Sequence, residues 1–121
     1  MVVSAFFENV SRHKAEGREL RPGEEPENMV LEFRPRPAHD MLVACLWSKW
    51  TGPGEPDLLS FAAITDDPPP EVAAAGHDRC IVSIKPENID AWLNQNLKDM
   101  GALHAILYDR DQPYYEHRMA A

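Results

Sequence analysis

The sequence predicts an α+β fold in which a mostly antiparallel, partly closed β-sheet carries short peripheral helices. Short β-branched and aromatic runs recur along the chain, proline and glycine separate them, and helical patterns occur mainly in the second half. Strand pairs followed by helices are typical of the α+β class. The 44% hydrophobic and 26% charged residues are ordinary for a globular protein. The 121 residues fit a single domain.

The first third of the chain is expected to contain two strands. MVVSAFF at 1–7 is short, apolar and rich in β-branched and aromatic residues, which favours a strand. Residues 8–28 are polar and contain several glycines and prolines, so they predict a long exposed connection. MVLEF at 29–33 predicts the next strand, which we expect Pro35 and Pro37 to end.

A β-hairpin is predicted in the middle of the chain. LVACLW at 42–47 alternates little between apolar and polar residues, which predicts a strand covered on both faces. TGPGEPD at 51–57 is a turn sequence, and LLSFAAIT at 58–65 predicts the second strand. Trp47 is expected in the core, whereas Trp50, near the turn, is the freer side chain.

A short helix and a strand are predicted next. Three prolines at 68–70 precede EVAAA, and proline commonly starts a helix. Gly76 suits the C-terminal cap of that helix. CIVSI at 80–84 then predicts a strand.

A longer helix is predicted from Pro86 to about Met100, with Gly101 as its stop. ALHAILY at 102–108 is ambiguous between strand and helix. The predicted helix would place four apolar residues on one face: Ile89, Trp92, Leu93 and Leu97.

The charge and cysteine content restrict the function classes. The net charge is -8, and non-specific DNA affinity comes from Lys and Arg, so binding to nucleic acid needs a local basic patch. Cys45 and Cys80 stand apart in apolar surroundings, which favours two free thiols in a reducing cytoplasm. No run reaches the roughly 18 apolar residues of a membrane helix, so no membrane partner is expected. Basic residues that could be solvated faces or a phosphate track are Arg12, Lys14, Arg18, Arg21, Arg34 and Arg36.

Two side chains are candidates for acid–base chemistry. His77 lies between a predicted helix and a predicted strand, where imidazoles are often placed to exchange protons. Glu8 follows two phenylalanines, so partial burial would raise its pKa. Alternatives are a solvated loop histidine and an ordinary polar residue at a strand end. The five histidines show no zinc spacing, and no phosphate-binding glycine loop or serine nucleophile motif occurs, so no metal or cofactor is expected.

Residues 59–93 resemble the SOS-response-associated peptidase (SRAP) family. SAFFE at 4–8, LVACLWSKW at 42–50 and the ending PYYEHRMAA add to the resemblance, the last to phage-associated members. The segments that carry it in order are FAAIT, PPPEVAAA, His77-Asp78-Arg79, CIVSI, Pro86-Glu87 and Asp90-Ala91-Trp92-Leu93.

The resemblance implies an SRAP-like β-barrel fragment with a groove for single-stranded DNA. Family members capture abasic sites covalently through an N-terminal cysteine. By motif, Glu8 and His77 correspond to assisting catalytic residues, and Arg79 would lie beside DNA phosphates. Trp50 is the candidate for stacking on bases. No cofactor is implied.

The sequence departs from the family at position 2, where Val2 stands instead of the cysteine nucleophile. The resemblance therefore predicts one domain over 1–121 that lacks the family's N-terminal portion and has little catalysis alone. Two alternatives stay open: a peptidase or hydrolase, as the family name suggests, and an inactive phage-remnant interaction domain. Unpaired strand edges predict a homo-oligomer.

Overall fold

The structure, a computed structural model, describes residues 1–120. It contains 22% helix and 38% strand, with antiparallel sheets, which confirms the α+β prediction. The sheets are not closed. The chain forms two compact units: a first unit of residues 2–41, 65–80 and 112 onward, and a second unit of Met1 with residues 42–64 and 81–111.

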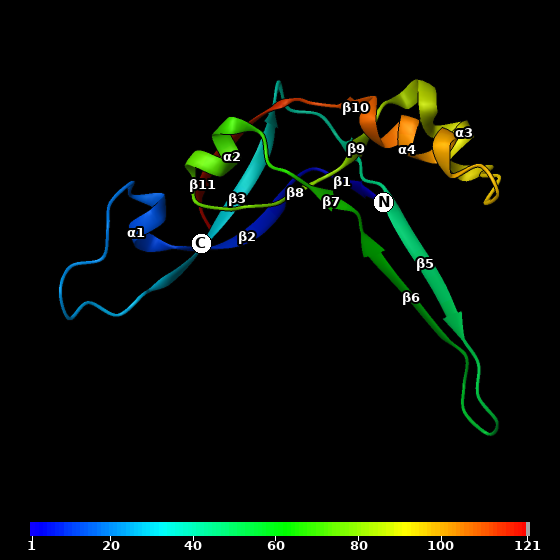
Figure 1. Cartoon of the computed structure of the whole chain (residues 1–121), viewed down its shortest axis with the longest axis horizontal. Coiled ribbons are helices and arrows are strands. Elements are labelled where there is room, and N and C mark those ends of the chain that lie inside the picture. Colours follow the sequence, from blue (N-terminus) through cyan, green and yellow to red (C-terminus); the bar gives the residue numbers. More distant parts are fainter. Residues whose placement is uncertain (121) are drawn as a thin grey trace. The chain divides into compact units, whose positions relative to one another are not determined.

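An antiparallel three-stranded sheet organises the first unit (Figure 1). Its central strand is β3 (Asn28–Arg36), flanked by β2 (Phe6–Ser11) and β11 (Tyr114–Met119). The short helices α1 (Arg12–Ala15) and α2 (Pro70–Ala74) belong to the same unit. Shorter pairings join β1 (Val2–Val3) to β4 (Met41–Leu42) and β7 (Thr65–Asp66) to β8 (Cys80–Ile81).

Aromatic packing holds the three strands of the first unit together. The rings of Phe6 and Phe33 stack with centroids 5.0 Å apart, and Tyr115 meets Phe6 edge-on at 5.2 Å. All three side chains are buried. Tyr115 comes from the charged C-terminal end, for which no strand was predicted, and it becomes core because β11 pairs with β3 over six residues.

Two predicted boundaries of the first unit were wrong. The opening strand divides into β1 and β2, and β2 continues to Ser11, so the polar connection begins only after α1. Pro35 does not end β3 but lies buried inside it. Since β2 pairs only as far as Phe33, Pro35 has a neighbouring strand on one side alone, and there its missing N–H is tolerated.

The second unit combines a hairpin with short helices. The hairpin consists of β5 (Cys45–Trp50) and β6 (Leu58–Ala63), paired antiparallel as predicted (Figure 1). The remaining elements of this unit are β9 (Ser83–Ile84), β10 (Arg110–Asp111), the 3-10 helix η1 (Pro86–Asn88), α3 (Ile89–Leu93) and α4 (Met100–Tyr108). CIVSI divides because Val82 bonds to Ala44 and Ile64, between β8 and β9.

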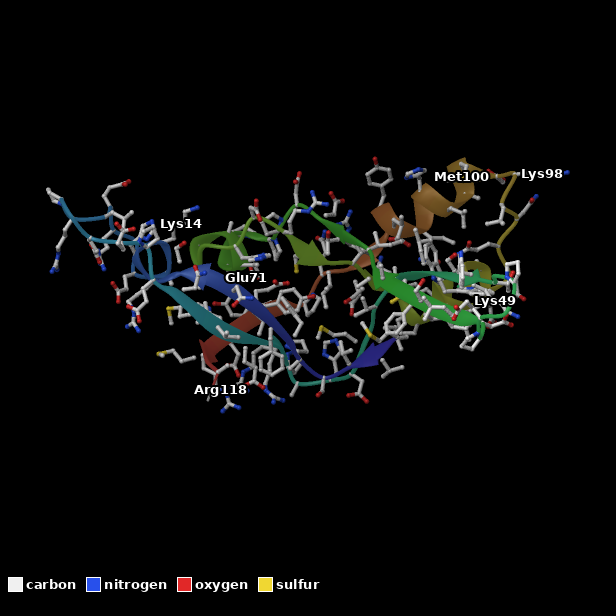
Figure 2. All side chains as sticks on the ribbon, turned by 90° about the horizontal axis from the view of Figure 1, so that it is seen from below. Lys14, Lys49, Glu71, Lys98, Met100 and Arg118 are labelled. Carbon is white, nitrogen blue, oxygen red and sulfur yellow. The ribbon has the colours of Figure 1, made fainter. Side chains whose placement is uncertain are left out.

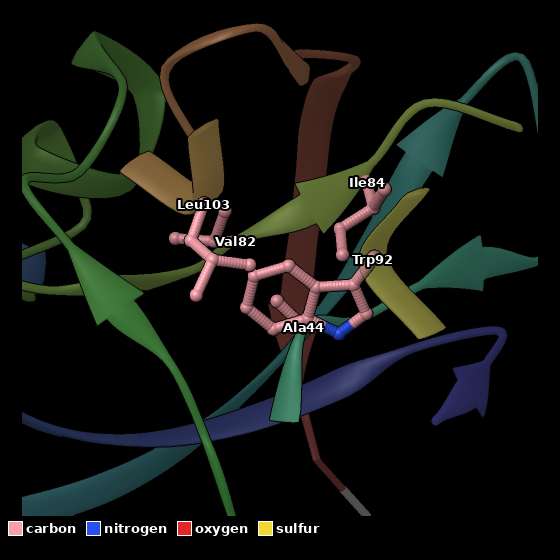
Figure 3. Close-up of a cluster of buried hydrophobic side chains, with 5 residues drawn as sticks. All are labelled: Ala44, Val82, Ile84, Trp92 and Leu103. Carbon is pink, nitrogen blue, oxygen red and sulfur yellow. The ribbon is translucent and has the colours of Figure 1, made fainter. Parts of the chain in front are cut away.

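The core of the second unit gathers around one tryptophan. Trp92 lies among small and branched apolar side chains (Figure 3). The buried cluster consists of Ala44, Val82, Ile84, Trp92 and Leu103.

The predicted helix from Pro86 to Met100 was wrong. Helical structure ends at Leu93, and α4 starts afresh at Met100, where the Asp99 carboxylate accepts the Ala102 N–H at 3.0 Å as an N-cap. Gly101 therefore lies inside α4, and the ambiguous segment 102–108 is helical. Of the predicted apolar face, Trp92 is buried, but Leu93 and Leu97 are exposed.

The predicted burial of residues 42–47 was wrong for the part that enters the hairpin: Val43 and Ala44 are buried, but Leu46 is exposed. Trp47, expected in the core, is 75% exposed, and Trp50 is exposed as expected. Both strands of the hairpin expose apolar side chains because β5 and β6 form a sheet of two strands alone. Cys45 and Cys80 form no disulfide within residues 1–120, and Cys80 is buried whereas Cys45 is partly exposed.

Candidate functional site

A carboxylate and an imidazole meet in the first unit. Glu8, on β2, places Oε2 3.1 Å from Nε2 of His77. Both side chains are largely shielded, with 24% and 18% of their surfaces exposed. Two candidates for acid–base chemistry that are separated by 69 positions in sequence thus come into contact.

The chain after α2 orients the imidazole. Gly76 ends α2 with φ +97, a conformation that favours glycine, and turns the chain into His77. The His77 Nδ1 atom lies 2.7 Å from the carbonyl oxygen of Arg79. Since a carbonyl can only accept, this short contact requires a hydrogen on Nδ1, whereas the Arg79 N–H, 3.3 Å from the same atom, would donate to it only in the other tautomer. We assign the hydrogen to Nδ1 from the shorter of the two distances.

This orientation leaves one shared proton between Glu8 and His77. With Nδ1 protonated, a hydrogen bond between Nε2 and Oε2 requires either imidazolium facing carboxylate or neutral imidazole facing carboxylic acid. Burial raises the pKa of Glu8, the positive charge of His77 opposes that rise, and the nearby Asp78 carboxylate adds to it. The pair is therefore suited to taking up and releasing a proton.

Arg79 is fixed by its neighbour across the β7–β8 pair. Its guanidinium donates from Nη2 to the Thr65 carbonyl at 3.1 Å and to the Thr65 hydroxyl at 3.2 Å, with Nε 3.4 Å from the same hydroxyl. The residue remains exposed. A guanidinium that is anchored on one side and solvated on the other can meet an anion.

An open pocket of about 630 Å³ adjoins the imidazole. Its lining includes two basic residues from the predicted basic run, Lys14 and Arg18. Arg18 is neutralised by Glu16 and Glu24, whereas no ion pair of Lys14 is found among residues 1–120. Both residues were recognised in the sequence as part of a basic run, but nothing in the sequence predicted that they lie near His77. The pocket is lined by Lys14, Gly17, Arg18, Glu19, Pro68, Ala73, Gly76, His77 and Asp78.

Trp50 is not part of this constellation. It belongs to the second unit, on β5, where it faces Leu58 across the hairpin and is 54% exposed. A Cβ atom on residue 52 would lie 2.4 Å from its indole, so a side chain there would require the indole to shift. Its role as a stacking residue stays a prediction.

The described part of the chain contains no group of three His, Cys, Asp or Glu side chains that could hold a metal ion. Within the same residues, every helix is too short or too polar to cross a membrane.

Comparison with family models gives a match over residues 1–120 to the SOS response associated peptidase (SRAP) family. The chain belongs to the SRAP family. The comparisons with curated proteins and with solved structures gave no match. The matched range includes Glu8, His77 and Arg79, and the structure brings the first two into direct contact.

Proposed function

We propose that this SRAP-family chain binds single-stranded DNA and that Glu8 and His77 move protons at an abasic sugar held beside them. The observation that carries the proposal is the 3.1 Å contact between Glu8 Oε2 and His77 Nε2. The match to the SRAP family over residues 1–120 gives that pair its chemical context.

The shared proton suits the opening of a sugar ring. An abasic deoxyribose is a cyclic hemiacetal, in which the ring oxygen must gain a proton and the anomeric hydroxyl must lose one. The imidazolium of His77 can donate to the ring oxygen while the Glu8 carboxylate accepts from the hydroxyl. The carbon–oxygen bond of the ring then breaks, the hydroxyl oxygen becomes the aldehyde oxygen, and no proton is gained or lost overall.

Cations near the pair can meet the DNA backbone. Arg79 is anchored by Thr65 yet exposed, and Lys14 lines the pocket beside His77. Phosphate contacts position a nucleic acid without reading its sequence. Because the chain carries a net charge of -8, we expect weak binding that depends strongly on salt.

The proposal includes no covalent capture by these 121 residues. Covalent capture through an N-terminal cysteine joins the sugar aldehyde to the thiol and the α-amine of that one residue in a thiazolidine ring. Position 2 is valine, and Cys45 and Cys80 lie inside the chain. The expected product is an opened sugar in a reversible complex.

Fluorescence anisotropy at low salt tests the binding step, with a labelled single strand that contains one abasic site. We expect Arg79→Ala to weaken binding and to reduce the slope of log affinity against log salt by about 1. Lys98→Ala, at an exposed lysine of the second unit, is the matched control. Absence of binding would overturn the proposal and favour an interaction domain.

A hydroxylamine probe that reacts with free aldehydes tests the chemical step. His77→Gln should bind the abasic strand as well as the native chain but slow the appearance of the probe adduct by about a hundredfold, the lower end of general acid–base effects. Equal rates for the native chain and His77→Gln would contradict the assigned role. A protein–DNA adduct that survives denaturation would contradict the reversible complex.

The peptidase alternative finds no nucleophile hydrogen-bonded to the pair. The side-chain hydrogen bonds and ion pairs of Glu8 and His77 within residues 1–120 are with each other and with the Arg79 backbone, and they include no Ser, Thr or Cys side chain. Hydrolysis of a peptide would need water as the attacking group. Peptide turnover that disappears in His77→Ala would favour this alternative over DNA binding.

A further inference from the structure

The hairpin of the second unit exposes large apolar side chains along both of its strands. Six large side chains on β5 and β6 are between 54% and 75% exposed. Isolated two-stranded hairpins are marginally stable in water, whereas added strands stabilise them. The six side chains are Leu46, Trp47, Trp50, Leu58, Leu59 and Phe61.

The outer edge of β6 has none of the usual protection against pairing. β6 reads Leu-Leu-Ser-Phe-Ala-Ala, without charge or proline. Soluble proteins usually protect such an edge with lysine, proline, a bulge or a covering element. Among the described residues, β6 pairs with β5 alone, so its other edge is open.

Charge allows a second copy of the chain to approach at this edge. The charge on β5 is Lys49 (Figure 2). Its Nζ atom lies 2.5 Å from the Asp57 carboxylate, which neutralises it. Two chains of net charge -8 repel each other over much of their surfaces. At the hairpin strands this repulsion is absent, because β6 carries no charged residue and Lys49 on β5 is paired with Asp57.

Cross-strand register selects one symmetric arrangement. In an antiparallel pair, opposed residues point to the same face, so a two-fold axis must pass beside a residue that opposes its own copy. Phe61 already lies opposite Trp47 within the hairpin. An axis at Phe61 sets Phe61 against its counterpart and gives a row of four aromatic rings on one face. Aromatic cross-strand pairs stabilise sheets.

We propose that β6 pairs antiparallel with β6 of a second copy about a two-fold axis at Phe61. The two hairpins then form one four-stranded sheet with an isologous interface. Of the six exposed side chains, Leu58, Leu59 and Phe61 lie on the pairing strand and contact the second copy, in addition to the main-chain hydrogen bonds that the new strand pair forms. The proposal is independent of DNA binding.

Light scattering and sedimentation over a range of concentrations test the assembly. The native chain should have the mass of two chains at high concentration, and Phe61→Lys should raise the dissociation constant at least about tenfold, since it places a charge at the centre of an apolar contact. Phe61 is 68% exposed, so this variant is expected to fold. Phe7→Lys, at an exposed phenylalanine on β2, is the matched control.

A disulfide test checks the register while keeping Phe61. An axis at Phe61 sets residue 60 opposite residue 62 of the second copy, so the double variant Ser60→Cys/Ala62→Cys should crosslink under mild oxidation faster than either single variant. A native chain that stays monomeric at all concentrations would overturn the proposal. So would a dimer that survives Phe61→Lys, or a monomer in which Phe61→Lys weakens only single-stranded DNA binding.

Discussion

Lys14 and Gly76 touch so closely that a Cβ atom on residue 76 would lie 2.9 Å from the Lys14 Cβ. It would also lie 3.3 Å from the backbone nitrogen of Ala15. α1 therefore packs on the turn that follows α2, immediately before His77. The absence of a side chain at residue 76 serves both this contact and the positive φ of the turn.

Gly76→Ala should destabilise the fold and displace His77. The alanine is strained at φ +97, at a cost of about 1–3 kcal/mol, and it also meets backbone atoms of α1. Urea unfolding measures the loss. Gly23→Ala is the control, since Gly23 has φ +79 but open space around it. We expect Gly76→Ala to cost more than Gly23→Ala, and equal losses would show that the contact with α1 is unimportant.

Glu71 should stabilise the end of the three-stranded sheet. Glu71 lies on α2 (Figure 2). Its carboxylate accepts the backbone N–H of Tyr115 at 2.9 Å. Glu71→Ala leaves that donor without its partner and should lower the free energy of unfolding by about 1–3 kcal/mol. Glu71→Gln keeps an acceptor oxygen and should cost much less. A similar loss in both variants, measured by urea unfolding, would attribute the effect to charge rather than to the hydrogen bond.

Local sequence signals predicted the elements whose structure is local. The turn at 51–57 and the proline-started helix with Gly76 as its cap were confirmed because turn and cap chemistry depends on adjacent residues. The course of β3 through Pro35 was not predictable, since it depends on where β2 stops pairing.

The candidate site shows the same division. Glu8 and His77 were selected as single residues by position and by family motif, and their contact follows from tertiary structure. The pocket beside them is lined in part by Lys14 of α1, and no helical pattern in the sequence predicted that helix. Leu46 and Trp47 are exposed although residues 42–47 were predicted to be buried, because a continuous apolar run indicates a strand that prefers burial without indicating whether a partner covers it.

Two neighbours on α3 test the observed core against the predicted helix face. Trp92 is 8% exposed and Leu93 is 73% exposed. Trp92→Ala should cost about 3–5 kcal/mol, as expected for the loss of a large aromatic from a core. Leu93→Ala should stay within about 0.5 kcal/mol. Thermal and urea unfolding measure the free energy lost in each variant. Comparable losses would show that Leu93 is buried as the predicted helix face requires.

Glu24 should make the loop after α1 sensitive to acid. Arg18 donates to both of its carboxylate oxygens, at 2.9 and 2.7 Å, and the Arg21 backbone N–H adds a third hydrogen bond. These contacts lower the pKa of Glu24 to about 2. Its contribution to stability is therefore present above the unfolded pKa and is lost as pH falls toward 2. The protection of the Arg21 amide, measured as its hydrogen-exchange rate relative to that of the unfolded chain at the same pH, should fall over that range.

Glu24→Gln should remove most of this acid dependence of amide exchange, because glutamine does not titrate. Glu25→Gln, on the same loop, is the control and should keep the native dependence. Identical pH profiles for the native chain and Glu24→Gln would contradict the role of the arginine contacts.

Glu8 should influence stability in the opposite direction to Glu24. Burial raises its pKa, so the folded chain holds the Glu8 proton more tightly than the unfolded chain does. Its stabilising contribution is complete below the unfolded pKa, about 4.3, and is lost as pH rises through the folded value. Relative to Glu8→Gln, the native chain should therefore lose free energy of unfolding over that rise. Urea unfolding at a series of pH values measures the difference.

Asp78 provides a second arm of the Glu8 experiment. Its negative charge adds to the raised pKa of Glu8, so Asp78→Asn should shift the loss of stability to lower pH. Glu19→Gln, at another carboxylate of the same pocket, is the control for a change of charge alone. The contradicting result is a native chain that gains free energy of unfolding relative to Glu8→Gln as pH rises. The contact with His77 would then stabilise the Glu8 carboxylate more than burial penalises it, and the two residues would form a fixed ion pair instead of sharing a proton.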